Sequence, residues 1–163
     1  MDEVWLGLRL LVLITVANSA PILAKKLAGR RWSQPLDGGA RFIDGRPLLG
    51  KSKTWRGLAA AVVACTVAAP LLGFNADHGA LAGLLAMAGD AISSFIKRRR
   101  GLEPSAQAFG LDQVPEALLP LLALRPGLEL SWVLVGGVTL AFLLLETPAA
   151  RLSHRLGLRD RPY

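Results

Sequence analysis

The stretch ALAGLLAMAGDAISSFIKRRRG, residues 80–101, decides how this chain folds. Its first part, residues 80–96, is apolar except for Asp90 and two serines, and four cations follow directly. A helix of about 20 apolar residues crosses the roughly 30 Å hydrocarbon core of a membrane. Lys and Arg collect at the cytoplasmic ends of such helices. The stretch therefore predicts a transmembrane helix whose basic end lies in the cytoplasm.

Further apolar stretches lie on either side of this one. Residues 4–24 are apolar apart from Arg9, and residues 58–74 and 128–145 are apolar almost throughout. A shorter candidate, residues 114–124, contains Pro115 and Pro120 and could be a kinked crossing or a re-entrant segment. Counting it as a crossing, the sequence predicts an all-α, polytopic membrane protein of five transmembrane helices, with its active site formed by cytoplasmic loops.

The distribution of charge supports five crossings. The 163-residue chain is 52% hydrophobic yet carries a net charge of +7. Nine Lys and Arg fall in residues 25–56, four in 97–100 and four after residue 150. Five crossings place all three clusters on one side of the membrane, whereas four would separate the last two. We therefore expect one unit, residues 1–163, in the cytoplasmic (inner) membrane, with its N-terminus outside and its C-terminus in the cytoplasm.

Several classes of site are unsupported by the residue types present. The single cysteine, Cys65, lies in an apolar stretch and predicts only packing. His78 and His154 lack the spacing of zinc ligands. A Ser-His-Asp set is not recognisable, so the sequence gives no support for acyl-transfer hydrolysis.

The loop DGRPLLGKSKTWRG, residues 44–57, formally matches the P-loop pattern G-x-x-x-x-G-K-[ST]. A true P-loop needs a preceding strand in an α/β domain, which this apolar chain does not offer, and Pro47 removes an amide from the phosphate cradle. Ser52 or Thr54 can cap the following helix, whose N-terminus attracts anions. Anchoring to anionic lipid headgroups is the alternative. We predict that five basic residues around that terminus bind a polyanion: Arg41, Arg46, Lys51, Lys53 and Arg56.

Asp90 is unusual because an ionisable residue inside an apolar span is costly and commonly functional. On a helix it shares one face with Ser94, Lys97 and Arg98. A purely structural ion pair is the alternative for Asp90. Asp112, in FGLDQVPE (residues 109–116), lies where the chain re-enters the membrane and can complete a carboxylate pair with Asp90. Magnesium is commonly held by one or two carboxylates with substrate phosphates and waters.

An acidic metal site among cations in a membrane frame suits phosphoryl or nucleotidyl transfer between a soluble nucleotide and a lipid. A small membrane transporter or channel for anions is the main alternative. It is less favoured because the polar residues lie at one membrane face and no inverted repeat is visible. A structural adaptor would leave Asp90 unexplained.

These motifs resemble those of the CDP-archaeol synthase family, which is related to the phosphatidate cytidylyltransferases. The resemblance rests on four groups of residues in the same order along nearly the whole chain: 44–47 with 50–57, 89–90 with 94–99, 111–113, and the ending 156–160 with Pro162. It implies five transmembrane helices, and CTP and Mg²⁺ as requirements. It also implies attack by a lipid phosphate on the nucleotide, giving a CDP-lipid and pyrophosphate.

The acceptor implied by the resemblance is 2,3-bis-O-geranylgeranyl-glycerol 1-phosphate or a phosphatidate-like lipid. Asp90 and Asp112 are then expected to bind magnesium, while Lys97 and Arg98 bind the triphosphate or the lipid phosphate. The residues expected to bind substrate are Asp44, Arg46, Lys51, Ser52, Lys53, Thr54 and Arg56 of the loop, with Ser94 and Gln113. Membrane lipids are expected neighbours, nucleic acid is not, and the oligomeric state stays open.

Overall fold

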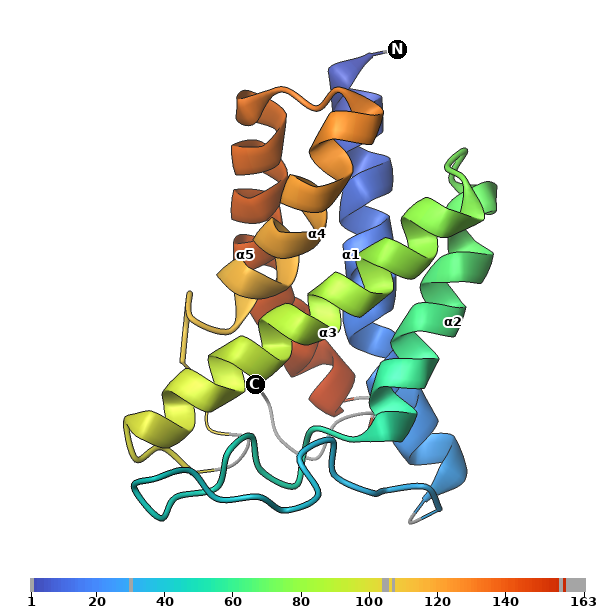
Figure 1. Cartoon of the computed structure of the whole chain (residues 1–163). Coiled ribbons are helices and arrows are strands. Elements are labelled where there is room, and N and C mark those ends of the chain that lie inside the picture. Colours follow the sequence, from blue (N-terminus) through green and yellow to red (C-terminus); the bar gives the residue numbers. More distant parts are fainter. Residues whose placement is uncertain (1, 30, 104–105, 107, 156, 158–163) are drawn as a thin grey trace.

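A computed structural model describes residues 2–29, 31–103, 106, 108–155 and 157. Within these residues the only regular elements are helices, apart from two isolated β-bridges, which confirms the predicted all-α fold class. Figure 1 shows the five helices in order: α1 (Glu3–Ala28), α2 (Trp55–Leu71), α3 (Ala76–Arg99), α4 (Gln113–Leu128) and α5 (Trp132–Arg155). The family-like ending, residues 156–160 with Pro162, falls outside the described residues except for Gly157.

Side-chain caps fix where the first two helices begin. The Asp2 carboxylate accepts a hydrogen bond from the backbone N–H of Val4 at 3.2 Å. The Thr54 hydroxyl accepts one from the backbone N–H of Gly57, also at 3.2 Å, so Thr54 rather than Ser52 caps α2. Such caps satisfy backbone donors that have no partner inside the helix.

Three helical segments among the described residues are long and apolar enough to cross a membrane: α1, α3 and residues 132–152 of α5. The α2 helix is apolar but shorter, at 17 residues. The predicted boundaries of α4 and α5 were wrong, because α4 continues to Leu128 and α5 begins only at Trp132. Pro120 and Pro126 lie inside α4 instead of ending it. Neighbouring helices make prolines tolerable in membrane helices.

The central helix, α3, packs against its neighbours through glycines. A Cβ placed on Gly79 would overlap the carbonyl oxygen of Cys65 in α2. On Gly83 it would lie 2.7 Å from the carbonyl oxygen of Ala61. Small residues let helix backbones approach this closely, as is common between membrane helices. Cys65 itself is fully buried, as expected for a packing residue.

The two ends of the bundle differ in character. Figure 1 shows the start of α1, the α2–α3 turn and the α4–α5 turn at one end. The long loop of residues 29–54 lies at the other end, below the C-terminal half of α3, which runs obliquely across the bundle. The most basic loop and the basic end of α3 therefore lie together, away from the acidic start of the chain.

Candidate active site

An ion pair between Lys53 and Asp90 forms the centre of the candidate site. The Lys53 ammonium (Nζ) lies 2.5 Å from Oδ1 and 2.5 Å from Oδ2 of Asp90. Lys53 belongs to the loop before α2, and Asp90 lies within α3. Only 18% and 20% of the two side chains are exposed. The predicted polyanion-binding loop and the predicted metal-binding helix therefore meet at these two residues.

Glu116 is a third member of this centre that the sequence analysis missed. Its carboxyl group lies beside the Asp90 carboxyl group and interacts with it, and only 8% of Glu116 is exposed. The contact arises because Gly89 of α3 touches the backbone of Pro115 in α4. A glutamate four residues after Asp112 in an otherwise apolar helix was the available signal.

Lys97 and Asp112 form a second buried ion pair nearby. Lys97 Nζ lies 2.6 Å from Asp112 Oδ1 and donates to the carbonyl oxygen of Ala106 at 3.0 Å. Asp112 Oδ2 accepts a hydrogen bond from the N–H of Ala108 at 2.9 Å. The two predicted magnesium ligands, Asp90 and Asp112, thus contact different lysines, and their sharing of one metal ion stays a prediction.

Arg98 is a buried cation with unused donors. It is 3% exposed, and its Nη2 donates to the carbonyl oxygen of Glu103 at 2.7 Å. Its Nε and Nη1 are buried without a hydrogen-bond partner in the part of the chain that the structure describes. Ser94, predicted on the same face, is also buried, while its neighbour Ser93 donates to the carbonyl oxygen of Leu111. A buried guanidinium with two free N–H donors suits a phosphate oxygen.

Gln113 links the start of α4 to α5. Its Oε1 accepts from the N–H of Gly110 at 2.8 Å, and its Nε2 donates to Glu146 at 2.9 Å. Glu146 is a further acid that the sequence analysis did not select, although it follows directly on an apolar stretch. Gln113, predicted to bind substrate, therefore also orients the segment that carries Asp112.

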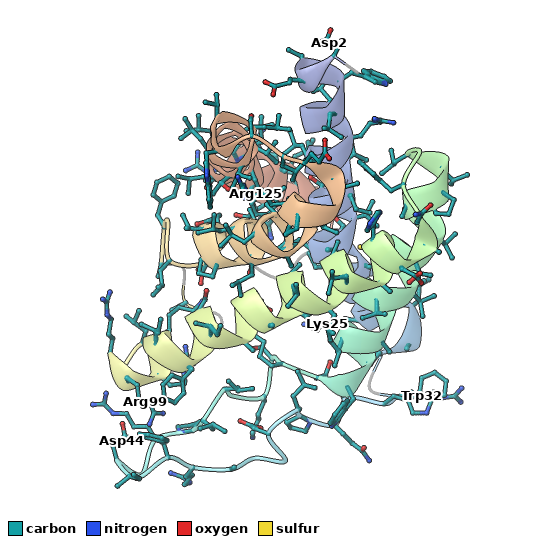
Figure 2. All side chains as sticks on the ribbon, turned by 45° about the horizontal axis from the view of Figure 1, so that its top comes forward. Asp2, Lys25, Trp32, Asp44, Arg99 and Arg125 are labelled. Carbon is teal, nitrogen blue, oxygen red and sulfur yellow. The ribbon has the colours of Figure 1, made fainter. Side chains whose placement is uncertain are left out.

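A clasp of Asp44, Arg46 and Arg99 holds the long loop against α3. Arg99 Nη1 lies 2.5 Å from Asp44 Oδ1, and Figure 2 shows these side chains meeting at the edge of the bundle. Arg46 Nη1 donates to the carbonyl oxygen of Arg99 at 2.7 Å. The Arg99 guanidinium also lies over the rings of Phe42 and Phe95, at 4.7 and 5.0 Å from their centroids. Asp44 and Arg46, predicted to bind nucleotide, are thus engaged within the protein.

Asp37 shapes the same loop, although the sequence analysis did not single it out. Its carboxylate accepts hydrogen bonds from the backbone N–H groups of Gly39, Leu49 and Gly50 at 2.9–3.2 Å. Burial raises the pKa of Asp37, but these hydrogen bonds outweigh burial and hold the pKa below its ordinary value. The charged carboxylate therefore keeps the chain turned just before Lys53.

The remaining predicted loop residues lie outside this centre. Lys51 and Ser52 are exposed beside it. The Arg56 guanidinium donates to the carbonyl oxygens of Gly29 and Arg31 at 2.8 and 2.7 Å, so it ties α2 to the end of α1. The structure therefore places Lys53 in the acidic centre, whereas Arg56 lies outside it and holds the start of the loop by hydrogen bonds.

The charge state of Lys53 follows from its neighbours. Burial lowers the pKa of Lys53, but the negative charge of Asp90 and the hydrogen bond to it raise the pKa above its ordinary value. Glu116 and Asp112 add to this effect. Lys53 is therefore a charged ammonium at neutral pH, and all three acids act on it.

The acids present fit a magnesium site completed by substrate. Among the described residues, no three His, Cys, Asp or Glu side chains group as a protein-only metal cage would require. Asp90 and Glu116 nevertheless offer two carboxyl groups in contact. Magnesium is often held by one or two carboxylates, with phosphates and waters supplying the other ligands. The donor set therefore suits a metal that arrives with a nucleotide.

The known proteins that are similar to this chain agree with one another in the family they indicate. A family model described as "CarS-like: CDP-archaeol synthase" matches residues 5–82. A CDP-archaeol synthase of Hyperthermus butylicus is 42% identical over 147 residues, covering 86% of this chain and 80% of that protein. One from Aeropyrum pernix is 34% identical, covering 100% and 94%. A solved structure described as an intramembrane enzyme for archaeal membrane lipid biosynthesis is similar with a TM-score of 0.72, at 34% identity, covering 86% of this chain and 90% of that one.

Proposed function

The chain belongs to the CDP-archaeol synthase family, and we propose that it transfers CMP from CTP to the phosphate of a membrane lipid. The products are a CDP-lipid and pyrophosphate. The relatives named above match most of this chain and most of their own lengths. Residues 1–163 act, in this proposal, as one membrane-embedded unit.

The reaction requires little acid–base catalysis by the protein. A phosphate monoester has a second pKa of about 6, so the lipid phosphate is largely dianionic at neutral pH. One of its oxygens attacks the α-phosphorus of CTP, the bond from that phosphorus to the bridging oxygen breaks, and pyrophosphate leaves. No general base is needed, and catalysis reduces to positioning and to neutralising charge.

The buried group of Lys53, Asp90 and Glu116, beside Lys97 and Asp112, is the observation that carries this proposal. It combines carboxyl groups that suit magnesium with ammonium groups that suit phosphates. Magnesium would neutralise the triphosphate there and assist departure of pyrophosphate. Arg98, whose Nε and Nη1 have no hydrogen-bond partner among the described residues, is suited to the lipid phosphate or to the triphosphate.

The assignment of magnesium ligands has two versions. The sequence-based version pairs Asp90 with Asp112, and the contact with Asp90 favours Glu116 as the partner. The exposed loop residues Lys51 and Ser52, close in sequence to Lys53, are proposed to contact the nucleotide. Ser94 and Gln113 support the α3 and α4 ends of the site.

The proposed membrane arrangement follows from the difference in charge between the two ends of the helix bundle. All five helices cross, the N-terminus lies outside, and the C-terminus and the loop of residues 29–54 lie in the cytoplasm. The site then faces the cytoplasm, where CTP is found, while the lipid enters from the membrane. An anion channel would need polar groups through the midplane, and no observation favours that alternative.

The deciding experiment offers detergent-purified protein CTP, magnesium and a panel of lipid phosphates with ether or ester chains. Formation of a CDP-lipid and pyrophosphate, with CTP used far better than ATP or GTP, is the expected result. Equal rates with all nucleotides would remove the cytidylyltransferase assignment. The panel also identifies the lipid acceptor and whether magnesium is required.

A further inference from the structure

Lys53 is placed where a cation chelated by Asp90 would lie. Its ammonium is 2.5 Å from each carboxylate oxygen of that aspartate. We propose that Lys53 is a built-in substitute for the metal ion, which holds Asp90 while no metal is bound. When a divalent cation arrives with the nucleotide, Lys53 leaves Asp90 and binds the phosphates. This inference rests on the proposed function, because it concerns the metal and nucleotide of that site.

The acidic centre needs a cation at all times. Asp90 and Glu116 are in contact, and both are largely shielded from water. A buried carboxylate left without an opposite charge is strongly destabilising. Within the described residues, Lys53 supplies the ammonium that pairs with Asp90, whereas Lys97 pairs with Asp112. Lys53 therefore stabilises the empty site.

Hydrogen bonds hold the backbone of Lys53 in place, so its side chain can move without the backbone. Its N–H donates to the carbonyl oxygen of Gly50 at 3.3 Å, and its own carbonyl oxygen accepts from Leu36 at 2.8 Å. The next residue, Thr54, caps α2. The backbone is thus held on both sides, while the four-carbon side chain carries a compact ammonium that can reorient. Lys97 differs, because a bond to the carbonyl oxygen of Ala106 also holds its ammonium.

A coupling between metal and nucleotide follows from this arrangement. A divalent cation alone must displace Lys53 from Asp90 and leave the ammonium without a partner. When the nucleotide is present, its phosphates give Lys53 a new partner. Metal and nucleotide therefore strengthen each other's binding, and the two effects must be equal in size because binding is reciprocal.

The test measures binding of Mn²⁺, as a spectroscopic probe for magnesium, to the full-length protein in detergent. Free Mn²⁺ is followed by electron paramagnetic resonance, with and without CTP and without any lipid acceptor. Lys53→Met removes the competing cation, so we expect Mn²⁺ alone to bind about tenfold tighter, within the roughly 5–150-fold range of typical couplings. In Lys53→Met, the increase in Mn²⁺ affinity that CTP causes should be correspondingly smaller. Lys26→Met, which removes an exposed lysine in the last turn of α1, should leave the affinity for Mn²⁺ alone unchanged.

An affinity for Mn²⁺ alone in Lys53→Met that equals or falls below that of the unmodified protein overturns the inference. If Lys53→Met cannot be recovered folded, the unmodified protein and Lys53→Arg decide the question. Both keep a cation on Asp90, so both should bind Mn²⁺ weakly in the absence of CTP. With CTP present, the unmodified protein should bind Mn²⁺ at least about tenfold more tightly than without it. Absence of that enhancement also overturns the inference. Failure of the proposed function is distinct, since it appears as no CDP-lipid formed from CTP.

Discussion

Gly89 of α3 lies directly against the backbone of Pro115 in α4. A Cβ on Gly89 would overlap the Pro115 carbonyl oxygen and lie 2.7 Å from the N–H nitrogen of Glu116. The residues that follow these two, Asp90 and Glu116, have neighbouring carboxyl groups that interact. The close crossing of two helix backbones therefore determines the distance between the two acids of the candidate site.

Gly89→Ala should force α3 and α4 apart. Overpacking in a well-packed interior costs about 1–3 kcal/mol, so the apparent melting temperature in detergent should fall. Activity should fall further than stability explains, because Asp90 and Glu116 separate. Gly136→Ala in α5 is the matched control, since a Cβ there has no atom within 4 Å. Equal melting temperatures and rates for the two variants would show that the close approach is unimportant.

Asp90→Asn should lower turnover by about 10²–10³, the usual cost of losing one electrostatic contact to the transition state. Asparagine keeps the shape of the side chain but removes its negative charge. The measurement is the rate of CDP-lipid formation, with size-exclusion chromatography to confirm that the protein stays folded. A folded variant with near-normal turnover would refute the catalytic role of Asp90, and misfolding alone would favour a structural one.

The second metal ligand can be identified by double variants. If Asp90 and Glu116 hold one metal ion, Asp90→Asn with Glu116→Gln should be little slower than the worse single variant, because residues acting as a unit are non-additive. The same comparison with Asp112→Asn tests the pair that the sequence predicts. The acid that shares the metal ion with Asp90 is the one whose double variant is little slower than the worse single variant. For the other acid, the two losses of turnover should multiply. Should neither acid be needed, Asp44 is the next candidate.

The sequence predicts the helices well because their apolar length is a local property. Long apolar stretches and basic flanks were sufficient to find all five helices. The predicted end of the fourth helix was wrong because the apolar stretch was taken to end at residue 124, whereas the helix continues through Arg125 and Pro126 to Leu128. Pro120 is buried inside α4, where packing against other helices outweighs the loss of a backbone hydrogen bond. The α4 helix ends at Leu128, and the next residue, Glu129, caps it in a left-handed conformation with φ of 51°.

The site was only partly predictable for a different physical reason. Asp90 stands out because a charge within an apolar span is costly. Its contacts with Lys53 and Glu116 join residues far apart in the chain and depend on how α3 meets α4 and the loop. Glu116 was hidden as an ordinary acid in the first turn of a helix, where negative charge is common. Pairing of this kind needs the tertiary structure.

The proposed membrane arrangement predicts accessibility on both sides. Cysteine introduced at Lys51 or beyond residue 155 should react with a membrane-impermeant thiol reagent only in permeabilised cells. Cysteine introduced at His78, in the first turns of α3 beside the α2–α3 turn, should react in intact cells. Cys65 is buried and serves as background. Reaction at Lys51 in intact cells would contradict the five-helix topology.

The last prediction concerns the clasp of Asp44, Arg46 and Arg99. Arg99 pairs with Asp44, donates to the carbonyl oxygen of Pro47 and stacks on two aromatic rings. An exposed ion pair contributes about 0.2–1 kcal/mol, and each cation–π contact at an exposed site about 0.5–1 kcal/mol. Arg99→Ala should therefore weaken the closed loop by about 1–2 kcal/mol, which corresponds to roughly 5–30-fold more frequent opening.

Limited trypsin digestion measures that opening directly, as the rate of cleavage after Arg41 and Lys51 in the loop. The matched control is Arg100→Ala, because Arg100 is the exposed neighbour of Arg99 and its loss removes the same charge and one trypsin site. Faster cleavage in Arg99→Ala alone, with a raised KM for CTP, would mean that the clasp positions the loop that carries Lys53. Cleavage rates that match in both variants would contradict the clasp and return Asp44 and Arg46 to direct contact with the nucleotide.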